Sequence, residues 1–172
     1  MKGDLHTLQK VCLYGSKVML AGIWILGGIA AVLIAMGIEV LATDGSHQMF
    51  QDVLSVDLAN DSVLKCASAF AEIVIIFILA MVTVVCIRTL MVSIYSEHSP
   101  FTDDNVRVLL FISRLYLVIA FVFAVLEMTG ERGIASAAFM LFGCILISTV
   151  LYILALVVRY GAVLQNESDH TL

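Results

Sequence analysis

Proline is almost absent from this sequence: Pro100 is the only one among 172 residues. Because proline lacks a backbone donor and breaks helices, its scarcity permits long uninterrupted helices on both sides of residue 100. Charged residues are also few, at 13%, whereas soluble proteins contain about a quarter. Hydrophobic residues make up 62% and the mean hydropathy is +1.07. These values exclude an ordinary soluble domain and predict an integral membrane protein.

Patterns that would indicate catalysis, cofactors or nucleic acid are missing as well. The nine lysines and arginines form no basic patch, which argues against direct nucleic-acid binding. The four cysteines form no CxxC pair, and no Gly-rich phosphate loop or Gly-x-Ser-x-Gly elbow is present. Among the scattered histidines, His6, His98 and His170 are too isolated to predict a metal site. We therefore expect no enzyme, no catalytic residue and no cofactor.

What the sequence does contain is four long apolar runs. They predict helices over about 18–41, 66–90, 106–128 and 134–159, each long enough for the roughly 20 residues that cross a bilayer. The loop near 129–133 is so short that the last two helices must be an antiparallel pair. We predict an all-α, integral membrane bundle of four transmembrane helices, made of two hairpins in a single membrane domain over 1–172.

Three segments leave alternatives open. Residues 1–17 could form an amphipathic helix on the membrane surface or extend the first spanning helix. Within residues 42–65, a short helix on the bilayer would present one apolar side, made of Phe50, Val53, Leu54 and Leu58. Small residues recur every fourth position in the first run, at Gly27, Ala31 and Ala35. This stripe favours close helix packing, either within the chain or in a homodimer.

The distribution of lysine and arginine predicts the orientation, because these residues favour the cytosolic side. Segments 1–17, 88–107 and 159–172 together hold six, and segments 42–65 and 127–133 hold two. The six are Lys2, Lys10, Lys17, Arg88, Arg107 and Arg159. We therefore expect both termini (N-in, C-in), the polar insert 95–107 and the tail 160–172 to lie in the cytosol.

The polar insert 95–107 separates the two hairpins. Pro100 must end the preceding helix and pushes Ser99 toward an extended conformation. Thr102 can then cap the next helix with its side-chain oxygen, and Asp103 and Asp104 place negative charge in the first turn. A new helix is therefore predicted to begin directly after the insert.

Two motifs carry a resemblance to a known family. Ser99–Arg107, read as Ser-Pro-Phe-Thr-Asp-Asp-Asn-Val-Arg, resembles the Pro-Phe…Asn-Val-Arg signature of a bacterial four-span membrane family named only as domain of unknown function 2975. Arg159–Leu172 is similar to its closing segment, with a Gly-Ala, a Leu-Gln, a Glu, an Asp and a final Thr. The chain departs from the family at Val108–Ser113, where further arginines and an Ile-Gly are usual. The resemblance implies a multi-pass protein of the bacterial inner (plasma) membrane, and a partnership with a cytosolic helix-turn-helix regulator.

Both motifs would lie on the same side of the membrane, so we expect insert and tail to meet. In this interpretation Arg107 or Arg159 pairs with Glu167 or Asp169, and Phe101, Tyr160 and Leu164 add packing, because exposed ion pairs alone contribute little. The same surface could bind a cytosolic protein. The residues assigned to this structural clasp or partner site are Pro100, Phe101, Asn105, Arg107, Arg159, Tyr160, Gln165, Glu167 and Asp169.

Charges within or near the runs suggest a second function. Arg114 is expected near the inner boundary, and Glu39, Glu72 and Glu127 toward the outer ends of their helices. Acids inside a bundle often mark ion or proton routes, so these three could form a cation or proton site. The structural alternative makes Glu39 and Glu127 interfacial, with Glu72 protonated or paired with Lys65 or Arg132. The sequence thus favours a membrane sensor or regulatory partner first, and a small ion- or proton-coupled transporter or channel second.

Overall fold

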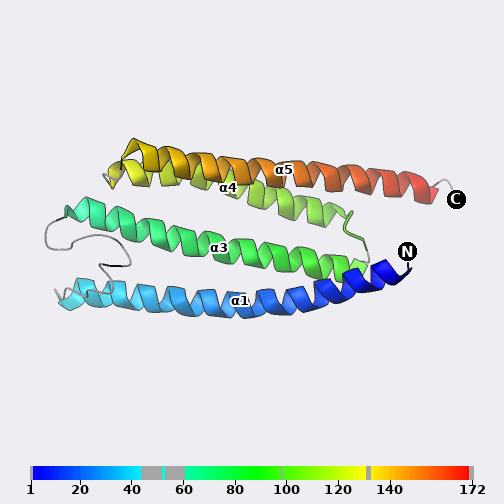
Figure 1. Ribbon diagram of the computed structural model, residues 1–172, viewed down its shortest axis with the longest axis horizontal. Helices are drawn as coiled ribbons and strands as arrows, with labels where there is room; N and C mark the ends of the chain where they lie inside the picture. Colours follow the sequence, from blue (N-terminus) through cyan, green and yellow to red (C-terminus); the bar gives the residue numbers. More distant parts are fainter. Residues whose placement is uncertain (1, 44–51, 53–60, 98, 131–132, 171–172) are drawn as a thin grey trace.

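Four long helices make up the fold. The computed structural model describes residues 2–43, 52, 61–97, 99–130 and 133–170. Within them the long helices are α1 (Lys2–Thr43), α3 (Val63–Glu97), α4 (Asp103–Thr129) and α5 (Ile134–His170). They alternate in direction, so α1 starts and α5 ends at the same end of the bundle (Figure 1). We call this the terminal end, and the opposite one the distal end. The predicted all-α bundle of four helices is confirmed.

All four helices are long and apolar enough to cross a membrane. Even α4, the shortest with 27 residues, is about 40 Å long at 1.5 Å per residue. The helices also extend beyond the predicted apolar ranges: α1 begins at Lys2, so residues 2–17 extend the first helix and do not form a separate one. The short helix expected around Phe50 to Leu58 lies outside the described residues.

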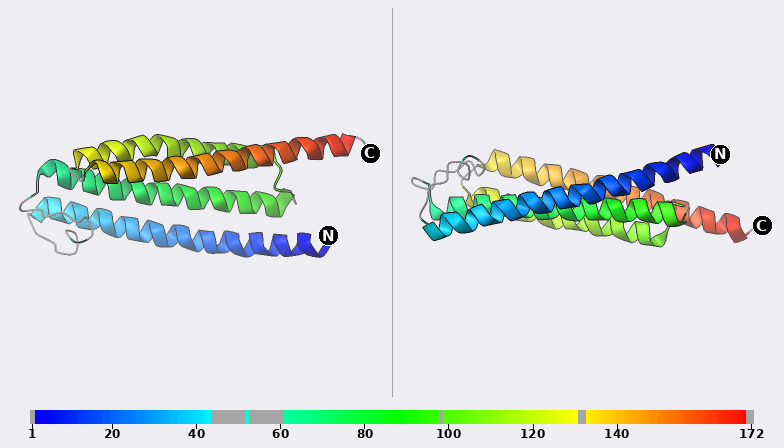
Figure 2. Two further views of the ribbon diagram at one scale, coloured as in Figure 1. Left: turned by 45° about the horizontal axis from the view of Figure 1, so that its top comes forward. Right: turned by 90° about the horizontal axis from the view of Figure 1, so that it is seen from below.

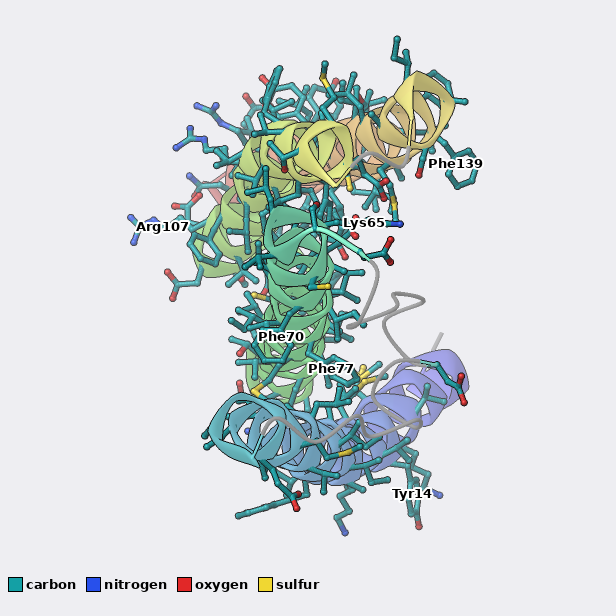
Figure 3. The ribbon with its side chains drawn as sticks, turned by 90° about the vertical axis from the view of Figure 1, so that its left-hand side faces the viewer. Tyr14, Lys65, Phe70, Phe77, Arg107 and Phe139 are labelled. Atoms are coloured by element: carbon teal, nitrogen blue, oxygen red, sulfur yellow. The ribbon has the colours of Figure 1, made fainter. Side chains whose placement is uncertain are left out.

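The helices are arranged as a row. Helix α3 packs against α1 on one side and α4 on the other, and α5 packs mainly against α4. Seen from the distal end, α1 and the α4–α5 pair lie on opposite sides of α3 (Figure 3), and the views of Figure 2 agree with this order. Large apolar side chains therefore face outward along α1, including Trp24 and Ile25, as expected for a surface covered by lipid.

Glycines bring α1 and α3 together. A Cβ at Gly15 would lie 2.8 Å from Met91 Sδ, and one at Gly22 would lie 3.9 Å from Val84 Cγ1. From the predicted small-residue stripe, Gly27 faces α3, where an added Cβ would lie 3.7 Å from Met81 Cε. The other two members, Ala31 and Ala35, are exposed. The stripe therefore serves intramolecular packing only through Gly27, and a homodimer on its exposed part stays a prediction.

Helices α3, α4 and α5 share the main core, in which Leu79, Ala120, Phe123 and Cys144 are buried together.

On the terminal-end side of this core, two serines join α4 to α5 by reciprocal hydrogen bonds. Ser113 Oγ donates to the Ser148 carbonyl oxygen at 3.0 Å, and Ser148 Oγ donates to the Ser113 carbonyl oxygen at 2.8 Å. Both serines are buried, so these bonds fix the register of the α4–α5 hairpin deep within its apolar contact.

Candidate functional site

The polar insert is short in the structure, because α3 continues to Glu97 and α4 begins at Asp103. Thr102 caps α4 as predicted: its backbone is extended, with φ −120° and ψ 149°, and its side chain accepts from Asn105 N at 3.3 Å. Asp103 and Asp104 occupy the first turn, where negative charge offsets the positive end of the helix dipole. The start of α4 is therefore fixed by local chemistry.

Asn105 ties the insert to this first turn. Its side chain is buried, with 3% exposure, and its Nδ2 donates to the Pro100 carbonyl oxygen at 3.1 Å. Ser99 Oγ in turn accepts from Phe101 N at 3.2 Å. Because a buried amide group is costly without hydrogen bonds, these contacts hold residues 99–105 in one conformation. Pro100 and Asn105 thus contact each other within the insert, and a role of either residue in binding a partner stays a prediction.

The insert meets the tail through two contacts, which we call the clasp: Ser99 with Gln165, and Phe101 with Gly161. Ser99 Oγ donates to Gln165 Oε1 at 2.9 Å. The Phe101 ring lies against Gly161 of α5, where an added Cβ would overlap the ring. Only glycine allows this approach. Insert and tail therefore touch, through residues 66 positions apart in the case of the hydrogen bond.

The clasp differs from the expected one in its chemistry. Arg107 pairs with Asp104 of its own helix at 3.6 Å, and both side chains are largely exposed. It points outward because Asn105, Val106 and Leu109 occupy the buried face of the first turns of α4. Arg159 and Glu167 are exposed on α5, and the side chain of Asp169 lies outside the described part of the chain. Packing of the Phe101 ring, which we expected, and a neutral hydrogen bond hold insert and tail together. Arg107 pairs within its own helix, and an ion pair of Arg159 with Glu167 or Asp169 stays a prediction.

Beyond Arg159, α5 carries an exposed apolar ridge, formed by Tyr160, Val163 and Leu164. Their side chains are 68%, 50% and 49% exposed. The spacing i, i+3, i+4 places them on one face of the helix. The helix continues to His170, so this ridge is presented on a regular helix whose other side is held by the clasp.

A second cluster lies toward the distal end, in the α3–α4 contact. Glu72 and Glu127 are buried, with 3% and 2% exposure. Two contacts define the register of these antiparallel helices: Thr83 Oγ1 lies 3.1 Å from Tyr116 Oη, and a Cβ added at Gly130 would lie 2.7 Å from Ser68 Oγ. This register brings Glu72 level with Glu127 across the contact. We call these two residues the carboxyl pair.

The other two charges that we predicted within the membrane, Glu39 and Arg114, lie elsewhere in the bundle. Glu39 is exposed on α1, which packs against α3 from the side opposite to α4. The structure therefore brings together two of the three glutamates that we had grouped. Arg114 is exposed on α4. Lys65, one expected partner of Glu72, forms an ion pair with Asp61 at 2.7 Å, and Arg132 lies outside the described residues. Within the described residues, no three potential ligand side chains are grouped so as to hold a metal ion.

Sequence reasoning missed Ser99 and Gly161 in the clasp and Ser113 and Ser148 between α4 and α5. Signals for three of them were present. A glycine inside a helix costs about 1 kcal/mol relative to alanine, so Gly161 indicates a close approach. Isolated serines in apolar helices typically bond across helices. No signal pointed to Ser99, because its partner depends on the tertiary contact.

Comparison with protein-family models, curated proteins and solved structures finds no match to this chain.

Proposed function

We propose that this protein is a sensor or regulatory partner embedded in the bacterial inner membrane, and that it binds a cytosolic protein through its terminal end. The count of lysines and arginines supports a cytosolic location for this end. The resemblance of the insert and tail motifs to the bacterial four-span family supports the membrane and suggests a helix-turn-helix regulator as the partner.

The apolar ridge Tyr160–Val163–Leu164 is the observation that carries the proposal. All three side chains lie beyond Arg159 and are at least 49% exposed, so in the proposed orientation they would face water. A ridge with i, i+3, i+4 spacing is typical of helices that bind in an apolar groove of a partner. The clasp holds the tail in place before binding, which lowers the entropy lost when a partner docks.

Photo-crosslinking from the ridge tests this function. The full chain would carry a photoreactive residue at Leu164, or at Asn166 as the matched control, since Asn166 is also exposed but lies on another face of α5. We expect one soluble protein to be captured from position 164 and not from 166. Val163→Ser should reduce that capture, and the captured protein should bind DNA. Equal capture from both positions would contradict the proposal.

The carboxyl pair supports a second candidate, an ion- or proton-coupled transporter or channel. Two buried acids at one level of a membrane protein repel each other unless a proton or a cation reduces their charge, and buried acids often belong to ion pathways. In this function Glu72 and Glu127 would bind the coupling ion between α3 and α4.

Flux measurements distinguish the two candidates. The protein would be reconstituted in proteoliposomes with an imposed pH gradient, and Glu72→Gln and Glu127→Gln would be compared with Glu39→Gln as the exposed control. Transport predicts a flux that both buried substitutions abolish and the control retains. A flux that is absent from the unmodified protein, or unchanged by Glu72→Gln, would eliminate this candidate and leave the regulatory one.

A further inference from the structure

Arg88 lies in the contact between α1 and α3. Met81, Val84 and Met91 form the side of α3 that meets the α1 glycines, and Arg88 falls between Val84 and Met91 at helical spacing, so it lies on that side too. The residue is partly buried, and its Nε is fully buried. A guanidinium group thus sits within an apolar seam between two spanning helices.

Within the described residues, this guanidinium group has no carboxylate partner. Its Nε has no hydrogen-bond partner there. The described acids nearest along the bundle, Asp103 and Asp104, belong to the first turn of α4, and Asp104 pairs with Arg107. By the Thr83–Tyr116 contact, Arg88 is level with Phe111, so Asp104 lies about 10 Å farther toward the terminal end. A cation whose Nε is buried in an apolar contact without a hydrogen bond is costly, and an anion bound to the guanidinium group would offset this cost.

The position of Arg88 along the bundle axis coincides with the place where we expect the bilayer to meet water. The contacts of Gly15 and Gly22 with α3 put Arg88 level with Val18, one residue from Lys17, and Arg114 lies about 5 Å deeper on α4. Tyr14 and Tyr152, 66% and 50% exposed, lie within about one turn of the same level. Aromatic and basic side chains gather where a bilayer meets water. The anions found at that depth are the phosphates of lipid headgroups.

We propose that Arg88 binds the phosphate of an anionic phospholipid headgroup in the α1–α3 seam. The fork of guanidinium N–H groups matches phosphate oxygens, and basic sites between transmembrane helices bind such headgroups. A lipid can approach Arg88 from outside the bundle, because Val85 and Val92, about one turn to either side of it, are each 43% exposed. The lipid phosphate supplies the missing anion, and its acyl chains cover the apolar surface beside the seam. This inference requires membrane insertion but neither the partner nor the transport function.

Native mass spectrometry of the full chain in neutral detergent tests the site. The protein would be titrated with phosphatidylglycerol, with phosphatidylcholine and with inorganic phosphate. We expect phosphatidylglycerol to bind more tightly than phosphatidylcholine, and Arg88→Gln to weaken it about tenfold. Arg114→Gln is the matched control, because it removes the same charge close to the same level from an exposed position, and it should change the affinity less than about twofold.

Three results would overturn the proposal. Phosphatidylglycerol could bind Arg88→Gln as tightly as the unmodified protein, Arg114→Gln could lose as much affinity as Arg88→Gln, or inorganic phosphate could displace the lipid in an Arg88-dependent manner. The last would assign the site to a free anion. If Arg88→Gln does not yield folded protein, Arg88→Lys replaces it. Lysine keeps the charge but loses the fork, so the affinity should still fall, and an unchanged affinity would also count against the site.

Discussion

Two opposing effects on the stability of the clasp determine the outcome of the substitution Gly161→Ala. Alanine is more favourable than glycine inside a helix by about 1 kcal/mol. Its Cβ, however, would overlap the Phe101 ring, so the ring must leave α5. Burying a phenylalanine side chain completely contributes about 1.5–3 kcal/mol. Because Phe101 is already 40% exposed, its displacement should cost about 1–2 kcal/mol. We expect Gly161→Ala to destabilise the clasp by between about 0 and 1 kcal/mol.

The same substitution should change sign when Phe101 is first replaced by alanine. Without the ring there is nothing to overlap, and Gly161→Ala should stabilise the tail helix by up to about 1 kcal/mol. The coupling energy of the double-mutant cycle is then about 1–2 kcal/mol. Hydrogen exchange read by mass spectrometry over residues 160–170 and 99–107 measures the local opening free energies. If Gly161→Ala has the same sign and size on both backgrounds, the two residues are not in contact and the clasp as described is wrong.

Three further substitutions probe the polar contacts. Ser113→Ala removes a reciprocal bond to Ser148 and should cost about 0.6–2 kcal/mol in detergent unfolding; Thr149→Ala is its control, because that hydroxyl bonds within its own helix. Tyr116→Phe should cost about 0.5–1.5 kcal/mol by losing the contact with Thr83, and an unchanged midpoint would argue against the α3–α4 register. Thr102→Ala should cost about 1 kcal/mol and speed exchange in the first turn of α4, while Thr102→Ser should restore it. Equal exchange in all three proteins would exclude a role for the cap.

Periodicity and length were enough to predict the helices, because crossing a bilayer demands long apolar runs whatever their contacts are. The cap at Thr102 was also predictable, since it depends on neighbours three residues apart. Helix ends were harder to predict from the sequence: residues 2–17 and 160–170, which flank the long apolar runs, continue α1 and α5. An apolar run indicates where lipid lies and does not determine where a helix ends.

The candidate site was predictable in its place but not in its contacts. That insert and tail meet follows from two antiparallel hairpins. Which side chains meet depends on the rotation of α5 about its axis, and this rotation turns Gly161 and Gln165 toward the insert and Tyr160 away from it. The burial of Glu72 and Glu127, and the exposure of Glu39, likewise depend on helix order. With α1 on the far side of α3, a glutamate on α1 cannot join the other two.

The order of the helices has a mechanical consequence. Helix α1 packs against α3, α3 against α4, and α4 against α5, so the protein behaves as two stiff hairpins joined at the α3–α4 contact. The carboxyl pair lies in the α3–α4 contact near the distal end, and α5 extends about 50 Å from the level of this pair to the tip of the tail. A rotation of about 5° between the hairpins there would move the tip by about 5 Å. A small rearrangement of the α3–α4 contact near the distal end is thus amplified into a displacement of several ångströms at the tip of the tail.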